Sequence, residues 1–321
     1  MIYDITIIGA GPTGLSVAVE AKKNNLSHLI IEKGSIVNSL QNYPTSMTFF
    51  STPELLEIGG VPFTSPTMRP GRIDGIQYYR KVSEFYNLNF EFNQNFIGFK
   101  KNKNIFEIET DKNIFKSKSI IIATGFFDNP NPVNVKGEEL KKVSHYYSEP
   151  YGFFKQKVAI IGAKNSAAIA ALELYRAGAE VTIIHRGKDL SENIKYWILP
   201  DLKNRIEEKV ISVFFNTKVL EITEKEIELE NLEKGKFKIE NNYVFAMTGY
   251  RPDISIFENC GIKFDENSLA PLHNETFETN VEGVYVAGSI TSGKNNNKIF
   301  IENGRHHGKI IIEDIRLKYL N

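Results

Sequence analysis

The sequence predicts an α/β protein with two Rossmann-like domains, each built around a parallel sheet. The main observation is a repeated pattern: an apolar strand, a glycine turn, a helix-length segment and a second apolar strand. The pattern begins at Gly9 and again at Gly162. The length of 321 residues also suffices for two domains with separate hydrophobic cores.

The first copy of the pattern carries three regularly spaced glycines. A strand at residues 5–8 leads into Gly9, Gly11 and Gly14, and the following helix extends to about residue 24. Such glycines let the backbone turn tightly, approach a diphosphate and pack the helix on the strand. Glu32 ends the second strand, where it can accept hydrogen bonds from ribose hydroxyls but would repel a 2′-phosphate. This pattern predicts a site for FAD or NAD.

The second copy has the opposite charge at the equivalent place. Its turn begins at Gly162, contains Lys164 and has Ala167 where a third glycine would stand. The second strand then ends in His185-Arg186-Gly187-Lys188 rather than in an acid. Cations there suit a 2′-phosphate, which arginine can bind through two hydrogen bonds. The second copy therefore predicts an NADPH site.

Three further strands define the expected domain boundaries. They end in Ala-Thr-Gly at 123–125, in Thr-Gly at 248–249 and in Ala-Gly at 287–288. We place the joints near 126 and 250, so that a discontinuous FAD-binding domain covers 1–126 and 251–321, and an NADPH-binding domain covers 127–250. A helix is expected at 74–86, a β-rich stretch at 89–122 and a single C-terminal helix at about 299–319.

The composition limits the class of partner. Lysines plus arginines number 39, as do aspartates plus glutamates, which argues against nucleic acid or an anionic membrane as the main partner. The one cysteine, Cys260, excludes an intramolecular disulfide and a CxxC redox pair. No apolar run, basic leader or metal-ligand spacing stands out. We expect a cytoplasmic protein that uses no metal.

With these motifs in view, the chain resembles the low-molecular-weight thioredoxin-reductase-like flavoproteins over nearly its whole length. The paired glycine turns, the Ala-Thr-Gly strand end, Gly249-Tyr250-Arg251-Pro252-Asp253 and the segment 283–288 carry this resemblance. Within that group the chain is most similar to the bacillithiol-disulfide reductase branch. That similarity rests on the following segments: Ile31–Gly34, Asn42–Thr45, Thr48–Ser51, Gly162–Ala167, Trp197–Pro200, Ile299–Gly304 and His307-Gly308.

The resemblance implies a homodimer with FAD and NADPH as cofactors, and it implies their contacts. For FAD these are Gly9, Gly11, Pro12, Thr13, Gly14, Glu32, Lys33, Gln41, Asn42, Tyr43, Thr48, Ala123, Thr124, Gly125, Gly288, Ser289 and Ile299. For NADPH they are Gly162, Lys164, Asn165, Ser166, Ala167, His185, Arg186 and Lys188. It also implies hydride transfer from NADPH to the flavin, because the cofactor carries the chemistry and the protein positions it.

Three residues are candidates for a direct part in catalysis: Tyr43, His307 and Thr13. Tyr43 is expected to stack on the flavin edge, with core packing as the alternative. The start of the C-terminal helix should face the flavin. His307 is either a proton donor to the flavin or a packed or exposed residue with no part in catalysis. Trp197 is either packing or a lid over nicotinamide. Arg69 and Arg72 either contact a substrate anion or are solvated loop charges.

Two departures leave the electron acceptor open. The chain lacks the CxxC of thioredoxin reductases, and Thr13 stands where the bacillithiol-reductase branch usually has cysteine. A hydroxyl cannot replace a thiolate in disulfide exchange. A small-molecule disulfide is the first expectation, and a small electron-transfer protein such as ferredoxin or flavodoxin is the second. A flavin monooxygenase and a non-catalytic flavin sensor remain further alternatives.

Overall fold

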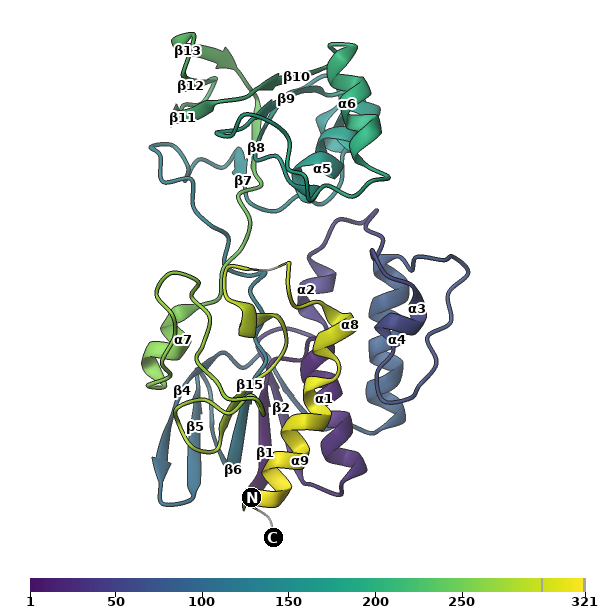
Figure 1. Ribbon diagram of the computed structural model, residues 1–321, viewed down its shortest axis with the longest axis vertical. Helices are drawn as coiled ribbons and strands as arrows, with labels where there is room; N and C mark the ends of the chain where they lie inside the picture. The colour runs from purple at the N-terminus through teal and green to yellow at the C-terminus, as the bar shows by residue number, and fades with distance from the viewer. Residues whose placement is uncertain (296, 320–321) are drawn as a thin grey trace. The chain divides into compact units, whose positions relative to one another are not determined.

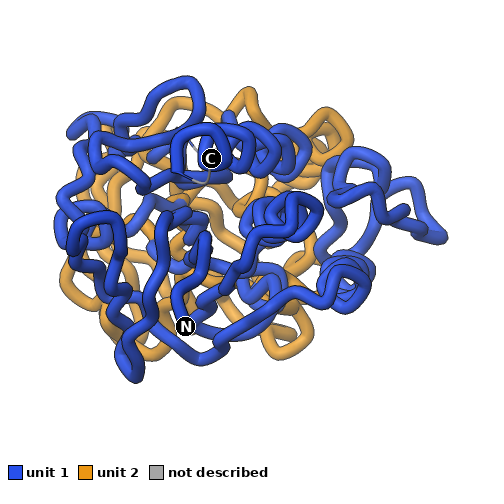
Figure 2. The backbone as a smooth tube through the Cα atoms, turned by 90° about the horizontal axis from the view of Figure 1, so that it is seen from below, with its two compact units in different colours: residues 1–42, 46–129, 250–321 blue, residues 43–45, 130–249 orange. Residues whose placement is uncertain are grey.

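The computed structural model describes residues 1–295 and 297–319 (Figure 1). The chain divides into two compact units (Figure 2). Unit 1 comprises residues 1–42, 46–129 and 250–321, and unit 2 comprises residues 43–45 and 130–249. Within the described residues, none of the helices combines the length and the apolar character needed to cross a bilayer.

Unit 1 is built on a seven-stranded sheet. Four neighbouring parallel strands have the order β3 (Phe90–Phe92), β2 (His28–Glu32), β1 (Ile2–Ile8) and β6 (Ile114–Ile122). A fifth parallel strand, β15 (Val284–Val286), pairs with the end of β6. β4 (Phe96–Asn102) and β5 (Ile105–Thr110) continue from the first half of β6 as an antiparallel meander. Ile5, Thr6 and Ile7 of β1 are fully buried, as expected for a central parallel strand.

The helices of unit 1 are mostly short. They are α1 (Pro12–Lys23), α2 (Asn38–Gln41), α3 (Pro53–Leu56), α4 (Arg72–Phe85), α7 (Ile254–Asn259), the 3₁₀ turn η2 (Gly288–Ser292), α8 (Ile301–Gly304) and α9 (His307–Tyr319). α9 packs along α1 (Figure 1).

The expected single C-terminal helix is broken between α8 and α9. The carbonyl of Arg305 accepts a hydrogen bond from Ser16 Oγ at 2.6 Å. The Arg305 guanidinium donates to the carbonyls of Glu54 and Glu57, both at 2.8 Å. These contacts anchor the corner between α8 and α9 to α1 and to the α3 region.

Unit 2 repeats the same design. A parallel five-stranded sheet has the order β10 (Ile211–Phe214), β9 (Glu180–Ile184), β8 (Lys157–Ile161), β14 (Tyr243–Ala246) and β7 (Val143–Ser144). Its helices are η1 (Tyr151–Phe153), α5 (Asn165–Arg176) and α6 (Leu199–Glu207). An antiparallel sheet of β11 (Thr217–Ile222), β12 (Glu226–Asn231) and β13 (Gly235–Glu240) completes the unit. The prediction of two Rossmann-like α/β domains is confirmed.

Candidate functional site

The turn after β1 needs glycine at two positions. Gly9 has φ of 107°, and a Cβ on it would lie 2.6 Å from the carbonyl oxygen of Ala123. A Cβ on Gly14 would overlap the carbonyl oxygen of Gly9. These two glycines let β1, α1 and the end of β6 meet closely.

Gly11 differs from its neighbours because the fold itself does not require a glycine there. Its φ is −70°, and a Cβ on it would have no described atom within 4 Å. Gly11 precedes the first turn of α1, which begins with Pro12. The open side of Gly11 at a helix N-terminus fits a diphosphate, which needs close approach to the backbone.

Glu32 lies at the end of β2 beside this turn. Its carboxylate accepts the N–H of Ala10 at 2.7 Å and the N–H of Gly34 at 2.9 Å, and the residue is 6% exposed. Burial is the largest effect on the side chain and raises its pKa, against the two backbone hydrogen bonds. The carboxylate retains lone pairs for two ribose hydroxyls. The adjacent Lys33 forms an ion pair with Asp128 at 2.8 Å.

The end of β6 and the start of η2 come together in unit 1. Thr124 Oγ1 is buried and has no hydrogen-bond partner among the described residues. Gly125 has φ of 69°, and a Cβ on it would lie 3.6 Å from Ser289 Oγ. A buried hydroxyl without a partner is uncommon in proteins. Thr124 therefore fits a site that a polar ligand such as a dinucleotide completes.

The structure brings Thr13, Gly288 and His307 together. A Cβ on Gly288 would lie 2.9 Å from Thr13 Oγ1, and a Cβ on Gly304 would lie 3.0 Å from the same atom. His307 Nδ1 accepts the N–H of Gly288 at 3.2 Å. Two glycines thus make room for the Thr13 side chain between η2 and α8.

His307 is held as a neutral ring. It is 5% exposed and stacks on Phe277 with centroids 4.0 Å apart. Burial lowers its pKa to about 4, with smaller contributions from His273 and His306. Because Nδ1 accepts a hydrogen bond in the neutral ring, the proton resides on Nε2.

A boundary between the two units falls within the segment that is expected at the flavin edge. Gln41 and Asn42 end α2 in unit 1, where the Gln41 carbonyl accepts a hydrogen bond from Arg72 at 2.9 Å. Tyr43 belongs to the segment 43–45, which groups with unit 2. There the N–H of Thr45 donates to the carbonyl of Ser148 at 2.9 Å. Ile299 stands two residues before α8.

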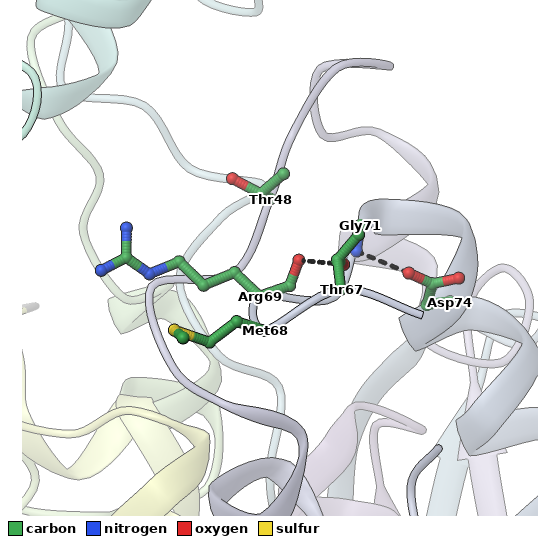
Figure 3. Close-up of a pocket in the computed structure, with 6 residues that line it drawn as sticks. All are labelled: Thr48, Thr67, Met68, Arg69, Gly71 and Asp74. Carbon is green, nitrogen blue, oxygen red and sulfur yellow. Dashed lines mark hydrogen bonds between the residues drawn. The ribbon is translucent and has the colours of Figure 1, made fainter. Parts of the chain in front are cut away.

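An open pocket of about 620 Å³ lies in unit 1 beside Thr48 (Figure 3). Its lining consists of Thr48, Thr67, Met68, Arg69, Gly71 and Asp74. Asp74 accepts the N–H of Gly71 at 2.8 Å and so caps α4. The Arg69 side chain is extended and points away from Asp74 (Figure 3). Arg69 and Thr48 were single candidates in the sequence, but their spacing gave no sign that they share a pocket.

The turn after β8 in unit 2, like the turn after β1, has a glycine at its start that no larger residue could replace. Gly162 has φ of 133°, and a Cβ on it would overlap the carbonyl oxygen of Met247. Lys164 and Ser166 are exposed at the start of α5, and Ala167 is buried. The glycine again allows the strand ends to meet at the helix N-terminus.

The side chain of Asn165 contacts protein groups in a loop of the same unit. Its Nδ2 donates to the carbonyl of Asn193 at 2.9 Å, and its Oδ1 accepts the N–H of Lys195 at 2.9 Å. The sequence predicts a cofactor contact at Asn165 but not these two hydrogen bonds. Their partners lie 28 and 30 residues away in the chain, beyond the reach of a local motif.

His185 marks a positive region at the end of β9. Burial lowers its pKa first, and the charges of Arg186 and Lys164 lower it further. Arg186 and Lys188 are exposed. These cations would stabilise a phosphate bound at the strand end.

Cys260 is unsuited to thiol chemistry. It is 6% exposed at the end of α7, and burial raises its pKa to about 12. A thiol in this state does not supply a thiolate near neutral pH. No cluster of three histidine, cysteine or acidic side chains able to hold a metal occurs among residues 1–295 and 297–319.

Comparisons with known proteins agree with this geometry. The sequence profile described as pyridine nucleotide-disulphide oxidoreductase matches residues 6–288. The bacilliredoxin reductase Bdr of Bacillus subtilis is 46% identical over 311 residues, which cover 96% of each chain.

Two solved structures are similar over the whole chain. Bacillithiol disulfide reductase Bdr (YpdA) from Staphylococcus aureus has 43% identity and a TM-score of 0.95, with 99% of this chain and 100% of that chain covered. The enzyme of the same title from Bacillus cereus has 42% identity and a TM-score of 0.97 with the same coverage. The resemblance stated from the sequence motifs is confirmed.

Proposed function

Because the chain belongs to the pyridine nucleotide-disulphide oxidoreductase family and is therefore an oxidoreductase, we propose that it is an FAD-containing reductase which takes electrons from NADPH. The observation that carries this proposal is the repeated glycine turn with residues of opposite charge at the equivalent strand end. The acid Glu32 stands there in the first copy, and the cation Arg186 stands there in the second. When bound, the flavin would accept hydride from the nicotinamide and pass electrons to an acceptor.

The residues of unit 1 support FAD as its cofactor. Gly11 leaves the N-terminus of α1 open to a diphosphate, Glu32 offers a fixed acceptor for ribose hydroxyls, and Thr124 offers a buried hydroxyl. Thr13, in the first turn of α1, lies against Gly288. These groups would bind and orient the cofactor, while the neutral His307 would hold the Gly288 amide in place.

The residues of unit 2 support NADPH over NADH. Lys164 and Arg186 both affect the pKa of His185, so their charges lie close to the end of β9. A 2′-phosphate placed among these groups would gain charge-assisted hydrogen bonds that NADH lacks.

For the acceptor, we propose a low-molecular-weight disulfide of the bacillithiol type. The support is the similarity to enzymes named bacilliredoxin reductase and bacillithiol disulfide reductase. A homodimer, as the resemblance implies, and a location in the cytoplasm, as expected from the sequence composition, belong to the same proposal.

One observation favours a second candidate. Thr13 carries no thiol, and the buried Cys260 supplies no thiolate. A ferredoxin or flavodoxin accepts electrons directly from reduced flavin and needs no thiol. An NADPH:ferredoxin or flavodoxin reductase is therefore the alternative.

The test begins with anaerobic addition of NADPH to the purified yellow protein. The proposal expects rapid bleaching of the flavin by NADPH, slow bleaching by NADH, and FAD rather than FMN on heat release. Turnover is then measured with bacillithiol disulfide, a ferredoxin and a flavodoxin as alternative acceptors. A flavin that NADPH leaves oxidised contradicts the proposal, and turnover with the electron-transfer proteins alone selects the second candidate.

A further inference from the structure

A loop of unit 2 follows the dinucleotide turn closely. It leaves β9 at His185 and reaches α6 at Leu199. The N–H of Ser191 donates to the carbonyl of Ala163 at 3.0 Å, within the turn itself. Ile194 and Ile198 are buried in the core of the unit. The three residues between these isoleucines are therefore held beside the turn at both ends.

Asn165 fixes the middle of this loop. As the first residue of α5, it stands where the turn becomes a helix. Its amide makes two bonds to the loop, one to the carbonyl of Asn193 and one from the N–H of Lys195, both at 2.9 Å. Two bonds from one planar group set the orientation of the loop as well as its distance. The tether joins the loop to the element on which a diphosphate would rest.

The tethered segment presents two aromatic rings and an ammonium group. Tyr196 is 77% exposed and Trp197 is 36% exposed. Their rings meet edge to face with centroids 4.8 Å apart, and Lys195 Nζ lies 5.9 Å from the Trp197 ring centroid. Rings suit stacking on a base or on nicotinamide, and an ammonium group suits a phosphate. A dinucleotide offers both kinds of group.

We propose, on the premise that unit 2 binds NADPH, that Asn165 is a positioning residue which holds Tyr196 and Trp197 as a stacking wall against the bound nucleotide. Asn165 acts through the loop, since both ends of its amide bond to loop backbone. The loop connects the basic end of β9 with the turn, so it follows the direction in which a dinucleotide would extend from its 2′-phosphate.

The first experiment uses Trp197 as the reporter, because the chain has one tryptophan. The holoenzyme is titrated with NADP⁺, which cannot reduce the flavin, and tryptophan fluorescence is followed beside calorimetric binding. The proposal expects a saturating change in fluorescence with the calorimetric Kd. Binding without a fluorescence change overturns this inference and leaves the proposed function intact, whereas absence of binding overturns both.

The second experiment is a double-mutant cycle on the Kd for NADP⁺. Asn165→Ala removes two hydrogen bonds and should weaken binding about five- to tenfold. The double variant with Trp197→Ala should bind no more weakly than the weaker of the two single variants, because both changes disable one wall. Additive losses would mean that Asn165 acts independently of the loop, and would overturn the inference.

The matched control is Asn242→Ala in the same unit. Asn242 Oδ1 accepts the N–H of Lys157 at 2.8 Å, at the opposite end of β8 from the turn. This change also removes an amide–backbone bond, but the Kd should stay within twofold of the wild-type value. An equal loss in Asn242→Ala would show a general effect on the fold and would count against the inference. Circular dichroism of each variant verifies that the compared proteins are folded.

Discussion

The carboxylate of Glu32 accepts the backbone N–H of Ala10 at 2.7 Å, across the glycine turn from β1 to α1. This bond fixes the acid at the place where an adenosine ribose would lie. Glu32→Gln keeps the shape of the side chain but removes its charge and one of its acceptor oxygens. We expect FAD affinity to fall about ten- to a hundredfold, the effect of losing charge-assisted bonds of about 1.5–3 kcal/mol.

Flavin absorbance per protein and FAD titration of the apoprotein measure this loss. Glu20→Gln is the control, since Glu20 lies in α1 and pairs with Lys23 on the surface. Full occupancy in Glu32→Gln would contradict the assignment of the FAD site.

Gly11 and Gly14 should respond differently to alanine. A Cβ on Gly11 meets no described atom within 4 Å, so Gly11→Ala should change the unfolding free energy of the apoprotein by less than about 1 kcal/mol. It should nevertheless lose most bound flavin, because the methyl group occupies the diphosphate approach. Gly14→Ala would overlap the Gly9 carbonyl and should destabilise the fold by about 1–3 kcal/mol. Denaturant unfolding and flavin content distinguish the two effects.

The basic end of β9 should determine the choice of nucleotide. Replacing Arg186 and Lys188 with alanine should raise the KM for NADPH about ten- to a hundredfold, because charge-assisted bonds to the 2′-phosphate are lost. The KM for NADH should stay within about twofold. Lys203→Ala, an exposed cation on α6, is the control. An unchanged NADPH preference in the double variant would refute the role of these residues.

Local sequence patterns predicted the two βαβ units, because the residues that define a strand, a glycine turn and the start of a helix are neighbours in the sequence. The first strand, helix and acid match β1, α1 and Glu32 within a few residues. The break in the C-terminal helix escaped prediction. Arg305 lies at this break and bonds to the carbonyls of Glu54 and Glu57, about 250 residues away. The Asn165 tether and the pocket at Thr48 also depend on distant partners, and no periodicity reveals such contacts.

His307 should make the protein less stable in acid. Its pKa is lowered to about 4 in the folded state, against about 6.5 in the unfolded chain. The contribution of His307 to the free energy of unfolding is therefore fully present above pH 6.5. It is lost as the pH falls toward 4, because the unfolded chain takes up a proton that the folded chain does not. At pH 5 the loss should be about 2 kcal/mol.

Denaturant unfolding of wild type and His307→Gln at pH 8 and at pH 5 measures this contribution. Glutamine can still accept the Gly288 N–H but does not titrate, so its pH dependence should be about 2 kcal/mol smaller than that of wild type. Lys309→Gln, at an exposed position of α9 beside His307, should keep the wild-type dependence. Equal pH dependence in His307→Gln and wild type would show that His307 titrates normally.

Electrons should leave the protein without help from Cys260. The thiol is buried and its pKa is raised to about 12, so Cys260→Ser should keep NADPH oxidation and acceptor reduction near wild type. Loss of all acceptor activity in this variant, with the flavin still reduced by NADPH, would refute an exit that needs no thiol.

Thr13 is where a thiol would change the outcome. Its Oγ1 lies between the backbones of Gly288 and Gly304, in the first turn of α1, where a helix N-terminus lowers the pKa of a cysteine. Thr13→Cys should raise the turnover of a bacillithiol-type disulfide several-fold if the natural acceptor is such a disulfide. Thr13→Ser, which resembles the cysteine variant in shape but carries no thiol, should leave this turnover unchanged. If Thr13→Cys gains no disulfide turnover while ferredoxin or flavodoxin reduction stays at the wild-type rate, the acceptor is an electron-transfer protein, because a one-electron exit from the flavin does not involve this side chain.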